Sequence, residues 1–330
     1  MKKGARRKPR RMLAESVPYV PAPMVEVTAR DYRLFRASHS DVMIEEVNVK
    51  LGGPWQVLST APPKDYQSEK TTVWSFPDRG DWATHAGNYR GNWSPYIPRN
   101  LLLRYTKPGD LVLDQMVGSG TTLVECKLLG RRAIGVDINP GAIMVARDRL
   151  NFPLHSLDRE HDPPEIQTFV GDARNLDAIP DGTVDLVATH PPYASIVSYS
   201  KDKIRGDLSS VRGIDFFIGE ITKVARESMR VLRPGGHCAI LMGDTRRHRH
   251  FVPISARVQQ AFLESGFLIR EDIMKIQHKM KSTRELWSGS KYDFLLLAHE
   301  HLFVFRKLAA GESLSPFRES ARWWAAPPGV

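Results

Sequence analysis

Residues His190, Pro191, Pro192 and Tyr193 form a short motif that follows an aliphatic run, residues 184–188. The run is typical of a buried strand, and the prolines must end it because they lack an N–H and fix their own φ. The proline carbonyls are therefore held rigidly and stay available to accept hydrogen bonds. The motif predicts a rigid corner of acceptors between an imidazole ring and a phenol ring.

A second motif is the glycine-containing turn in the segment LVLDQMVGSGTTLVEC. Gly118 and Gly120 would let the backbone turn tightly after a strand, and would let a ligand approach the main chain beside a helix N-terminus. Asp137 ends the next strand, where a carboxylate can accept hydrogen bonds from both ribose hydroxyls of an adenosine group. These residues together predict a nucleotide-like ligand.

The residues around the turn distinguish between nucleotide ligands. A dinucleotide-binding motif would have a third glycine where this chain has Leu123, and a P-loop would have a lysine where it has Thr121. Asp114 before the turn and Asp172 after a third strand favour S-adenosylmethionine, which carries a positive amino group, a sulfonium and an adenine amine. The alternative is that these two acids only cap the helices that follow them.

Strands and helices alternate from about residue 71 and would position both motifs. We expect strands at residues 111–114, 133–137, 167–170, 184–188, 237–242, 269–277 and 294–305. We expect helices at residues 121–129, 141–150, 215–232 and 253–265. The alternation predicts an α/β fold with a mostly parallel sheet of seven strands and helices on both faces. The last two strands have no clear helix between them, so they could pair antiparallel at the edge.

With both motifs on one edge of a sheet, the chain resembles the DNA amino-methyltransferases, which methylate N4 of cytosine or N6 of adenine. The resemblance covers roughly residues 74–307 and implies a Rossmann-like class I methyltransferase domain. The segment MVGSG matches the cofactor motif of the family, with Met116 in place of the usual aromatic residue. The segment YRGNWSPYIPRNLLLRY resembles the part that closes over the methionine end of the cofactor, and AHEHLFVFRK resembles the closing strand. The residues expected to bind S-adenosylmethionine are Asn92, Ser94, Pro95, Asp114, Met116, Gly118, Gly120, Thr121, Asp137 and Asp172.

The catalytic tetrad of this family begins with Asp, Asn or Ser, and here it begins with His190. The resemblance implies catalytic roles for His190, Pro191, Pro192 and Tyr193. An exocyclic amine is a poor nucleophile, so the Pro191 carbonyl and the His190 imidazole would accept hydrogen bonds from it, while Tyr193 would stack on a base flipped out of the duplex. An unperturbed pKa of about 6.5 for His190 predicts an acid limb in the rate profile. Alternatively, His190 points away and the Pro191 carbonyl alone is the acceptor.

The resemblance implies DNA methylation in a restriction–modification setting, with N4 of cytosine preferred because a first residue other than Asp is commoner in that subgroup. An RNA methyltransferase acting on guanine N2 or adenine N6 is an alternative, and so is an inactive module that binds nucleic acid. Methylation at carbon 5 of cytosine is disfavoured, because neither Cys126 nor Cys238 follows a proline in a loop. Target recognition could lie in residues 1–70, 195–213 or 278–292.

The chain of 330 residues has 47 Lys and Arg against 37 Asp and Glu, and this formal net charge of +10 favours a polyanionic partner. Two widely separated cysteines indicate a reducing compartment without disulfides or a metal site. No signal peptide or membrane-spanning run is visible, so we expect a cytoplasmic location. We expect a disordered basic arm at residues 1–12, an extension at 13–70, the methyltransferase domain at 71–308 and a tail at 309–330. Within the extension, residues 29–38 favour a helix and residues 47–51 a strand.

Overall fold

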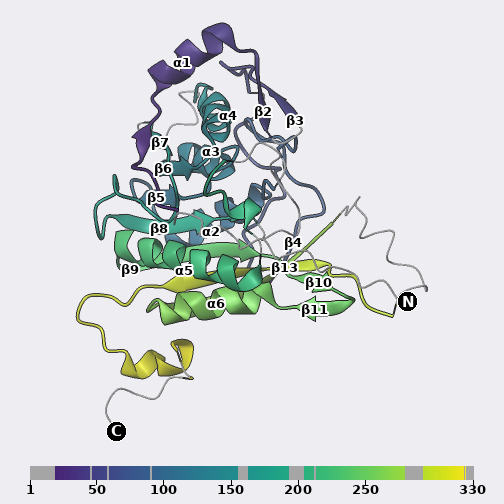
Figure 1. Ribbon diagram of the computed structural model, residues 1–330. Helices are drawn as coiled ribbons and strands as arrows, with labels where there is room; N and C mark the ends of the chain where they lie inside the picture. The colour runs from purple at the N-terminus through teal and green to yellow at the C-terminus, as the bar shows by residue number, and fades with distance from the viewer. Residues whose placement is uncertain are drawn as a thin grey trace, which may run out of the picture.

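The structure is a computed structural model that describes residues 19–44, 47–57, 59–89, 91–154, 163–192, 204–211, 213–278, 293–322 and 324. Its centre is a sheet of nine strands (Figure 1). In spatial order the strands are β1 (Val25–Glu26), β7 (Ile166–Val170), β6 (Arg132–Asp137), β5 (Leu111–Asp114), β8 (Val184–Thr189), β9 (Leu232–Met242), β13 (His299–Arg306), β12 (Leu268–Ile276) and β4 (Val73–Ser75). Only β1 and β13 run antiparallel to their neighbours in this sheet.

All seven expected strands are present in this sheet, so the Rossmann-like α/β fold class is confirmed. Two expected details are wrong. The last two expected strands, β12 and β13, do pair antiparallel, but β13 lies between β9 and β12 and the edge strand is β4. The four consecutive buried residues 302–305 of β13 fit this internal position. The sheet has nine strands rather than seven, because β1 and β4 add two and three residues at its edges. Strands this short have no alternation pattern that a sequence could reveal.

The strand order reverses between β5 and β8. From β5 the chain proceeds outward through β6 and β7, then returns to β8 and proceeds in the other direction through β9. In open parallel sheets, ligands bind in the crevice outside the carboxyl ends of two such strands. Since β5 ends at Asp114 and β8 at Thr189, the glycine turn and the His-Pro-Pro segment both leave the sheet at this crevice.

Helices cover both faces of the sheet (Figure 1). On one face, α5 (Ile214–Val231) and α6 (Ile254–Glu264) pack in a core that includes Leu113 and Val187. On the other, α2 (Tyr96–Tyr105), α3 (Thr121–Leu128) and α4 (Pro140–Leu150) pack in a core that includes Val112 and Leu186. Adjacent strand residues thus enter opposite cores, as a sheet buried on both faces requires.

The N-terminal extension packs on α4. It contains helix α1 (Ala29–Ser38) and the hairpin of β2 (Asp41–Ile44) and β3 (Val47–Lys50), so the helix and strand expected there are confirmed. Asp148 on α4 is fully buried and accepts hydrogen bonds from Tyr32 Oη (2.5 Å), Gly52 N (3.1 Å), Gly53 N (2.9 Å) and Trp55 Nε1 (2.9 Å). One carboxylate therefore joins three parts of the extension to the helix.

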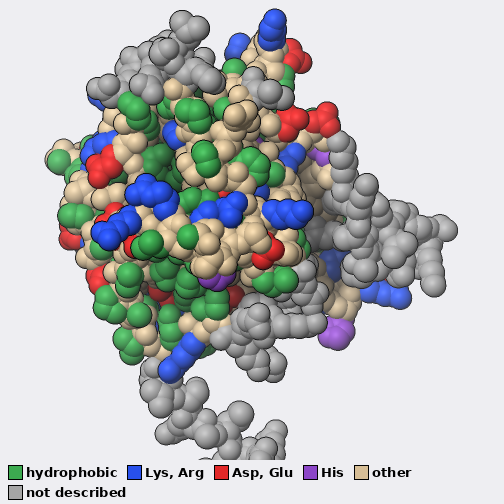
Figure 2. Space-filling view, turned by 90° about the horizontal axis from the view of Figure 1, so that it is seen from above, with side chains coloured by type: hydrophobic (Ala, Val, Ile, Leu, Met, Phe, Trp, Pro, Cys, Tyr) green, Lys and Arg blue, Asp and Glu red, His purple; other side chains and the backbone are tan. Residues whose placement is uncertain are grey.

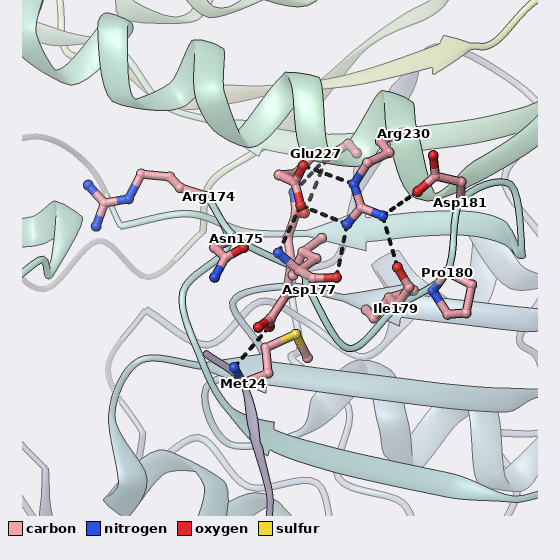
Figure 3. A network of polar contacts seen from close by, with 12 residues as sticks. Met24, Arg174, Asn175, Asp177, Ile179, Pro180, Asp181, Glu227 and Arg230 are labelled. Carbon is pink, nitrogen blue, oxygen red and sulfur yellow. Dashed lines mark hydrogen bonds and ion pairs between the residues drawn. The ribbon is translucent and has the colours of Figure 1, made fainter. Parts of the chain in front are cut away.

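A second polar network fixes the loop after β7 (Figure 3). Arg230 near the end of α5 donates to Glu227 and Asp181, and to the carbonyl oxygens of Leu176 and Ile179, both at 2.9 Å. The loop residue Asp177 accepts from the backbone N–H of Met24 at 3.0 Å, just before β1. The loop is thus attached both to α5 and to the edge strand from the extension.

Among the described residues, no helix is both long and apolar enough to cross a membrane. The arm expected at residues 1–12 lies outside the described residues. The boundaries expected at residues 70 and 308 stay a prediction, although β1 shows that part of the extension joins the central sheet.

Candidate active site

The glycine turn after β5 is held in place by β6. Val117 N donates to Val136 O at 2.9 Å, and Gly118 N donates to the Asp137 carboxylate at 2.9 Å. Gly118 has a φ of +50° and Gly120, the N-cap of α3, a φ of +85°, which are left-handed values that favour glycine. A Cβ on Gly120 would lie 3.0 Å from Ala146 Cβ on α4, and a Cβ on Gly118 would lie 3.1 Å from the Tyr89 ring. Because neither glycine has a side chain, the turn can pass close to α4 and to the Tyr89 ring where α3 begins.

Asp137 lies where a ribose-binding acid was expected. Its two carboxylate oxygens accept one hydrogen bond each, from Gly118 N and Asn139 N, both at 2.9 Å. Each carboxylate oxygen can accept a second hydrogen bond, so ribose hydroxyls can still bind. Burial raises the pKa of Asp137 to about 6, and hydrogen bonds from a ligand would favour the charged form.

Asp114 lies beneath the turn, with 3% of its surface exposed. It accepts from Met116 N at 3.2 Å and from the hydroxyl of Thr122 in the first turn of α3. Burial raises the pKa of Asp114 to about 7. These contacts support the alternative in which Asp114 stabilises the start of α3. Asp114 does so through Met116 N and the Thr122 hydroxyl, whereas the N-cap of the helix is Gly120. Met116 is partly buried and packs against the core under α5.

Asp172 is also buried, and its carboxylate has two partners. Arg174 donates to it through Nε (2.8 Å) and Nη2 (2.5 Å), and Tyr19 donates through its hydroxyl at 2.8 Å. The Arg174 guanidinium lies 4.7 Å from the centre of the Tyr19 ring. A ligand amine at Asp172 would therefore have to share the carboxylate with these side chains.

The residues expected at the methionine end lie beside α3. The Asn92 amide oxygen accepts from the Thr121 hydroxyl in the first turn of α3. The Ser94 hydroxyl donates to the carbonyl of Arg79 at 2.7 Å, and Pro95 is the N-cap of α2. The structure thus brings Asn92 and Thr121 together at the glycine turn, whereas Ser94 holds the preceding loop.

Arg79 lies beside Asn92 and was not expected at this site. Its Nη1 donates to the Asn92 carbonyl at 2.9 Å, while its Nε and Nη2 are buried and have no hydrogen-bond partner among the described residues. Burial and, to a smaller extent, the positive charge of Arg149 lower the pKa of Arg79 to about 10. A buried guanidinium with two unpaired nitrogens is rare and calls for an anion or another acceptor. No sequence signal singles it out, because an Arg between Asp78 and Asp81 looks like an ordinary surface charge.

His190 follows β8 and packs against Trp93. Their ring centres are 5.9 Å apart and their planes are inclined by 19°. Burial lowers the pKa of His190 to about 4, so its imidazole is neutral at ordinary assay pH. Pro191 is buried and Pro192 half-buried beside it, and Tyr193 lies outside the described residues. The structure thus brings the first three residues of the tetrad to the crevice that contains the glycine turn. Trp93 was not foreseen, because its stacking on His190 is a long-range contact.

Glu125 on α3 positions the loop that carries Arg79. It is fully buried and accepts from Trp82 Nε1 and His85 Nε2 at 2.7 Å, and from Arg99 Nη1 at 2.8 Å. A buried carboxylate with three donors is well compensated. The loop before α2 is therefore fixed against the same helix that begins at the glycine turn.

Comparisons with known proteins agree with this geometry. A family model described as DNA methylase matches residues 16–148, which include the glycine turn but end before His190, and a model described as methyltransferase domain matches residues 113–191. The Type II methyltransferase M2.DpnII of Streptococcus pneumoniae is 45% identical over 65 residues, 20% of this chain and 24% of that protein. The tRNA (guanine(10)-N2)-dimethyltransferase of Methanothermobacter thermautotrophicus is 31% identical over 116 residues, 35% of this chain and 32% of that protein.

A solved SAM-dependent methyltransferase from Methanosarcina mazei superposes with a TM-score of 0.42 at 17% identity, covering 63% of this chain and 97% of that one. The aligned parts of the two curated relatives are a quarter to a third of their length. The two family models overlap at residues 113–148, which contain the glycine turn and β6. Over this part of its length the chain is similar to proteins described as DNA methylases and as methyltransferases.

Proposed function

We propose that this protein transfers a methyl group from S-adenosylmethionine to an exocyclic amine of a DNA base, with N4 of cytosine preferred to N6 of adenine. The observation that carries the proposal is the meeting of two motifs at one crevice. The glycine turn leaves β5 and His190 leaves the adjacent strand β8, so a cofactor on the first would face a base at the second.

The residues at the crevice fit the cofactor. The glycine turn has no side chains that would keep a ligand away from its backbone. Asp137 can still accept hydrogen bonds from ribose hydroxyls. The two unpaired nitrogens of Arg79 can donate to the carboxylate of the cofactor. S-adenosylmethionine would supply a methyl group already activated by the sulfonium. The task of the chain is then to align and dehydrate the reactants. Asp172 and Asn92 would complete the adenine and methionine ends.

The His190 imidazole and the Pro191 carbonyl would accept hydrogen bonds from the two N–H groups of the target amine. A neutral imidazole has one nitrogen free of hydrogen, and burial against Trp93 keeps it neutral. Tyr193 would stack on the flipped base. When both N–H groups of the amine are held by fixed acceptors, the lone pair of the nitrogen can point at the methyl group. The rate then depends more on this alignment than on proton transfer.

Duplex DNA is supported as the substrate by the DNA methylase model and by the Type II methyltransferases among the relatives. A polyanionic substrate also suits the net charge of +10, and Figure 2 shows a row of Lys and Arg side chains across the face seen from above. The tRNA dimethyltransferase among the relatives favours a second candidate, methylation of an RNA base. The family model described as DNA methylase and several Type II methyltransferases among the relatives favour DNA, so we rank RNA second.

The test is methyl transfer from labelled cofactor to duplex DNA and, separately, to tRNA, followed by mass spectrometry of the nucleosides. N4-methylcytosine in DNA is the expected product. N6-methyladenine would correct the base, and label in tRNA alone would select the RNA candidate. Cofactor binding without transfer to either acid would indicate an inactive module. Asp137→Ala serves as the control, since losing a charge-assisted contact to ribose should weaken cofactor binding by about 1.5–3 kcal/mol.

A further inference from the structure

A small basic hairpin projects from the sheet near the proposed site. Strands β10 (Thr245–Arg247) and β11 (His250–Val252) pair antiparallel around a two-residue turn, His248 and Arg249. Five consecutive residues, 246–250, are Arg or His. A hairpin this short buries almost nothing, and its side chains from 247 to 251 are exposed. Burial therefore does not account for this composition.

The turn has an unusual backbone. His248 has a φ of +49° and Arg249 a φ of +70°, the left-handed pair of a type I′ hairpin turn, in which Asn-Gly is the preferred sequence. Non-glycine residues in this region carry strain, and strain at a surface turn points to a role for the side chains. Arg249 places a positive charge at the tip, at a position where glycine would relax the backbone.

The hairpin lies on the same edge of the sheet as the crevice. Thr189, the last residue of β8, pairs with Ile240 of β9, and β9 ends two residues later at Met242. Strands β8 and β9 are parallel neighbours, so the hairpin begins next to the point where His190 leaves the sheet. Figure 1 shows β10 and β11 beyond this end of the sheet, away from α1 and the C-terminal segment.

The base of the hairpin is rigid. Asp244 is buried and accepts from Ser255 N and Ser255 Oγ, both at 2.8 Å, which joins the residue before the hairpin to α6 after it. Arg246 donates through Nε and Nη2 to the Leu295 carbonyl (3.1 and 2.9 Å) and lies 5.2 Å from the centre of the Phe294 ring. The ion pair of Arg249 with Asp293, at 3.2 Å, is exposed on both sides and therefore weak.

We infer that this hairpin binds the phosphate backbone of duplex DNA beside the target base and holds the duplex while the base enters the crevice. The inference rests on the proposed function and specifies its DNA contact. Guanidinium groups pair well with phosphate oxygens, and a two-stranded ribbon has the size of a DNA groove. Such a contact needs a hairpin that is firmly attached to the protein and whose charged turn lies close to the point where His190 leaves the sheet.

The test compares a hairpin variant with a charge-matched control. Arg247→Gln, His248→Asn and Arg249→Gly together remove two guanidinium charges and install an Asn-Gly turn, which should leave the hairpin at least as stable. Arg318→Gln with Arg322→Gln removes two exposed charges from the C-terminal segment, on the other side of the molecule in Figure 1. The readouts are duplex affinity across salt concentrations, cofactor affinity by calorimetry and steady-state kinetics.

The hairpin variant should lower the slope of log K against log salt by about 1.8, since each lost phosphate contact removes about 0.9. The KM for DNA should rise, while kcat and cofactor affinity stay unchanged and the control variant behaves as wild type. Equal slopes in the hairpin variant and wild type would overturn the inference and leave the proposed function intact. A wild-type protein that binds cofactor but neither binds nor methylates duplex DNA would overturn both.

Discussion

His190 occupies a position where the resembling family has Asp, Asn or Ser, and its surroundings make the replacement chemically reasonable. A protonated imidazole has no acceptor and would repel an amine. Burial lowers the pKa of His190 to about 4, which keeps the ring neutral and gives it one acceptor nitrogen, and Trp93 is one of the side chains that pack against the ring. The buried histidine can then do what the amide oxygen of an asparagine does, provided that its hydrogen is on the other nitrogen.

The first prediction concerns the pH dependence of the single-turnover rate. The unperturbed pKa would put an acid limb near pH 6.5, but burial lowers the pKa of His190, so the limb should lie near pH 4. Wild-type rates should be flat between about pH 5.5 and 8 as far as His190 is concerned. Trp93→Ala would admit water, raise the pKa of His190 towards its ordinary value and move the limb upward.

Adding His190→Asn to the Trp93→Ala variant provides the control for that experiment. Asparagine keeps an acceptor oxygen and does not titrate, so the double variant should lose the shifted limb and retain some activity. The same limb in Trp93→Ala with and without His190→Asn would show that another group titrates. The Pro191 carbonyl would then be the only acceptor from the tetrad.

The second prediction concerns Arg79, whose replacement should change stability and cofactor affinity in opposite directions. Arg79→Met removes a buried charge that has two unpaired nitrogens, so the free energy of unfolding without cofactor should stay equal or rise. Cofactor affinity should fall roughly ten- to a hundredfold if the guanidinium binds the carboxylate. Chemical denaturation and calorimetry measure the two effects.

Arg149 offers a matched comparison, because it is also buried but donates to the Thr84 carbonyl and the Asn88 amide, both at 2.7 Å. Arg149→Met should therefore destabilise the protein, since two acceptors lose their partner. If Arg79→Met also unfolded the protein more easily and left cofactor affinity unchanged, Arg79 would be a structural residue and not a ligand for the cofactor.

At the scale of elements, the extension and the crevice are connected through α4. Asp148 attaches α1 and residues 52–55 to α4, while Ala146 on the same helix contacts the position where Gly120 has no side chain. The start of α3 is thus packed against a helix that the extension holds. The contacts thus join α1 and residues 52–55 to the helix that packs against the glycine turn.

The third prediction tests this connection. Asp148→Asn should lower the free energy of unfolding by about 3 kcal/mol, because four donors lose a charged acceptor and part of the bonding cannot be replaced by an amide. Hydrogen exchange should show faster exchange in α1 and around residues 52–55. Tyr32→Phe removes one of the four bonds and should cost about 1 kcal/mol. Unchanged protection of α1 in Asp148→Asn would mean that apolar packing alone holds the extension.

The sequence predicted the elements of the sheet well, because buried parallel strands are short apolar runs between turns, as at residues 111–114. It could not place β13 between β9 and β12 or detect β1, since strand order depends on tertiary packing. The glycine turn and the acids at strand ends could also be predicted, because their positions follow directly from the ends of these strands. Arg79 and Trp93 were not, because their roles come from contacts between distant segments. Asp114 could be recognised in the sequence as a candidate ligand for the cofactor, but in the structure its contacts are with its own loop and with α3.

At the scale of the whole molecule, the positive charge is unevenly distributed along the chain. Residues 1–12 contain seven Lys and Arg and no acid, so removing them lowers the formal net charge from +10 to +3. Most of the excess charge therefore lies in a segment that has very few apolar residues. A polyanion would be attracted to it without regard to sequence, whereas the hairpin at the sheet edge would contact the duplex at a fixed place.

The fourth prediction follows from this difference. Deleting residues 1–12 should lower the slope of log K against log salt by roughly 0.9 for each phosphate contact that the arm makes, and should slow association at low salt. Methylome sequencing of cells expressing each form should find the same methylated sequence, because phosphate contacts carry no base information. An unaltered salt slope after the deletion would show that the arm is solvated and touches no DNA, and a changed target sequence would place base recognition within those twelve residues.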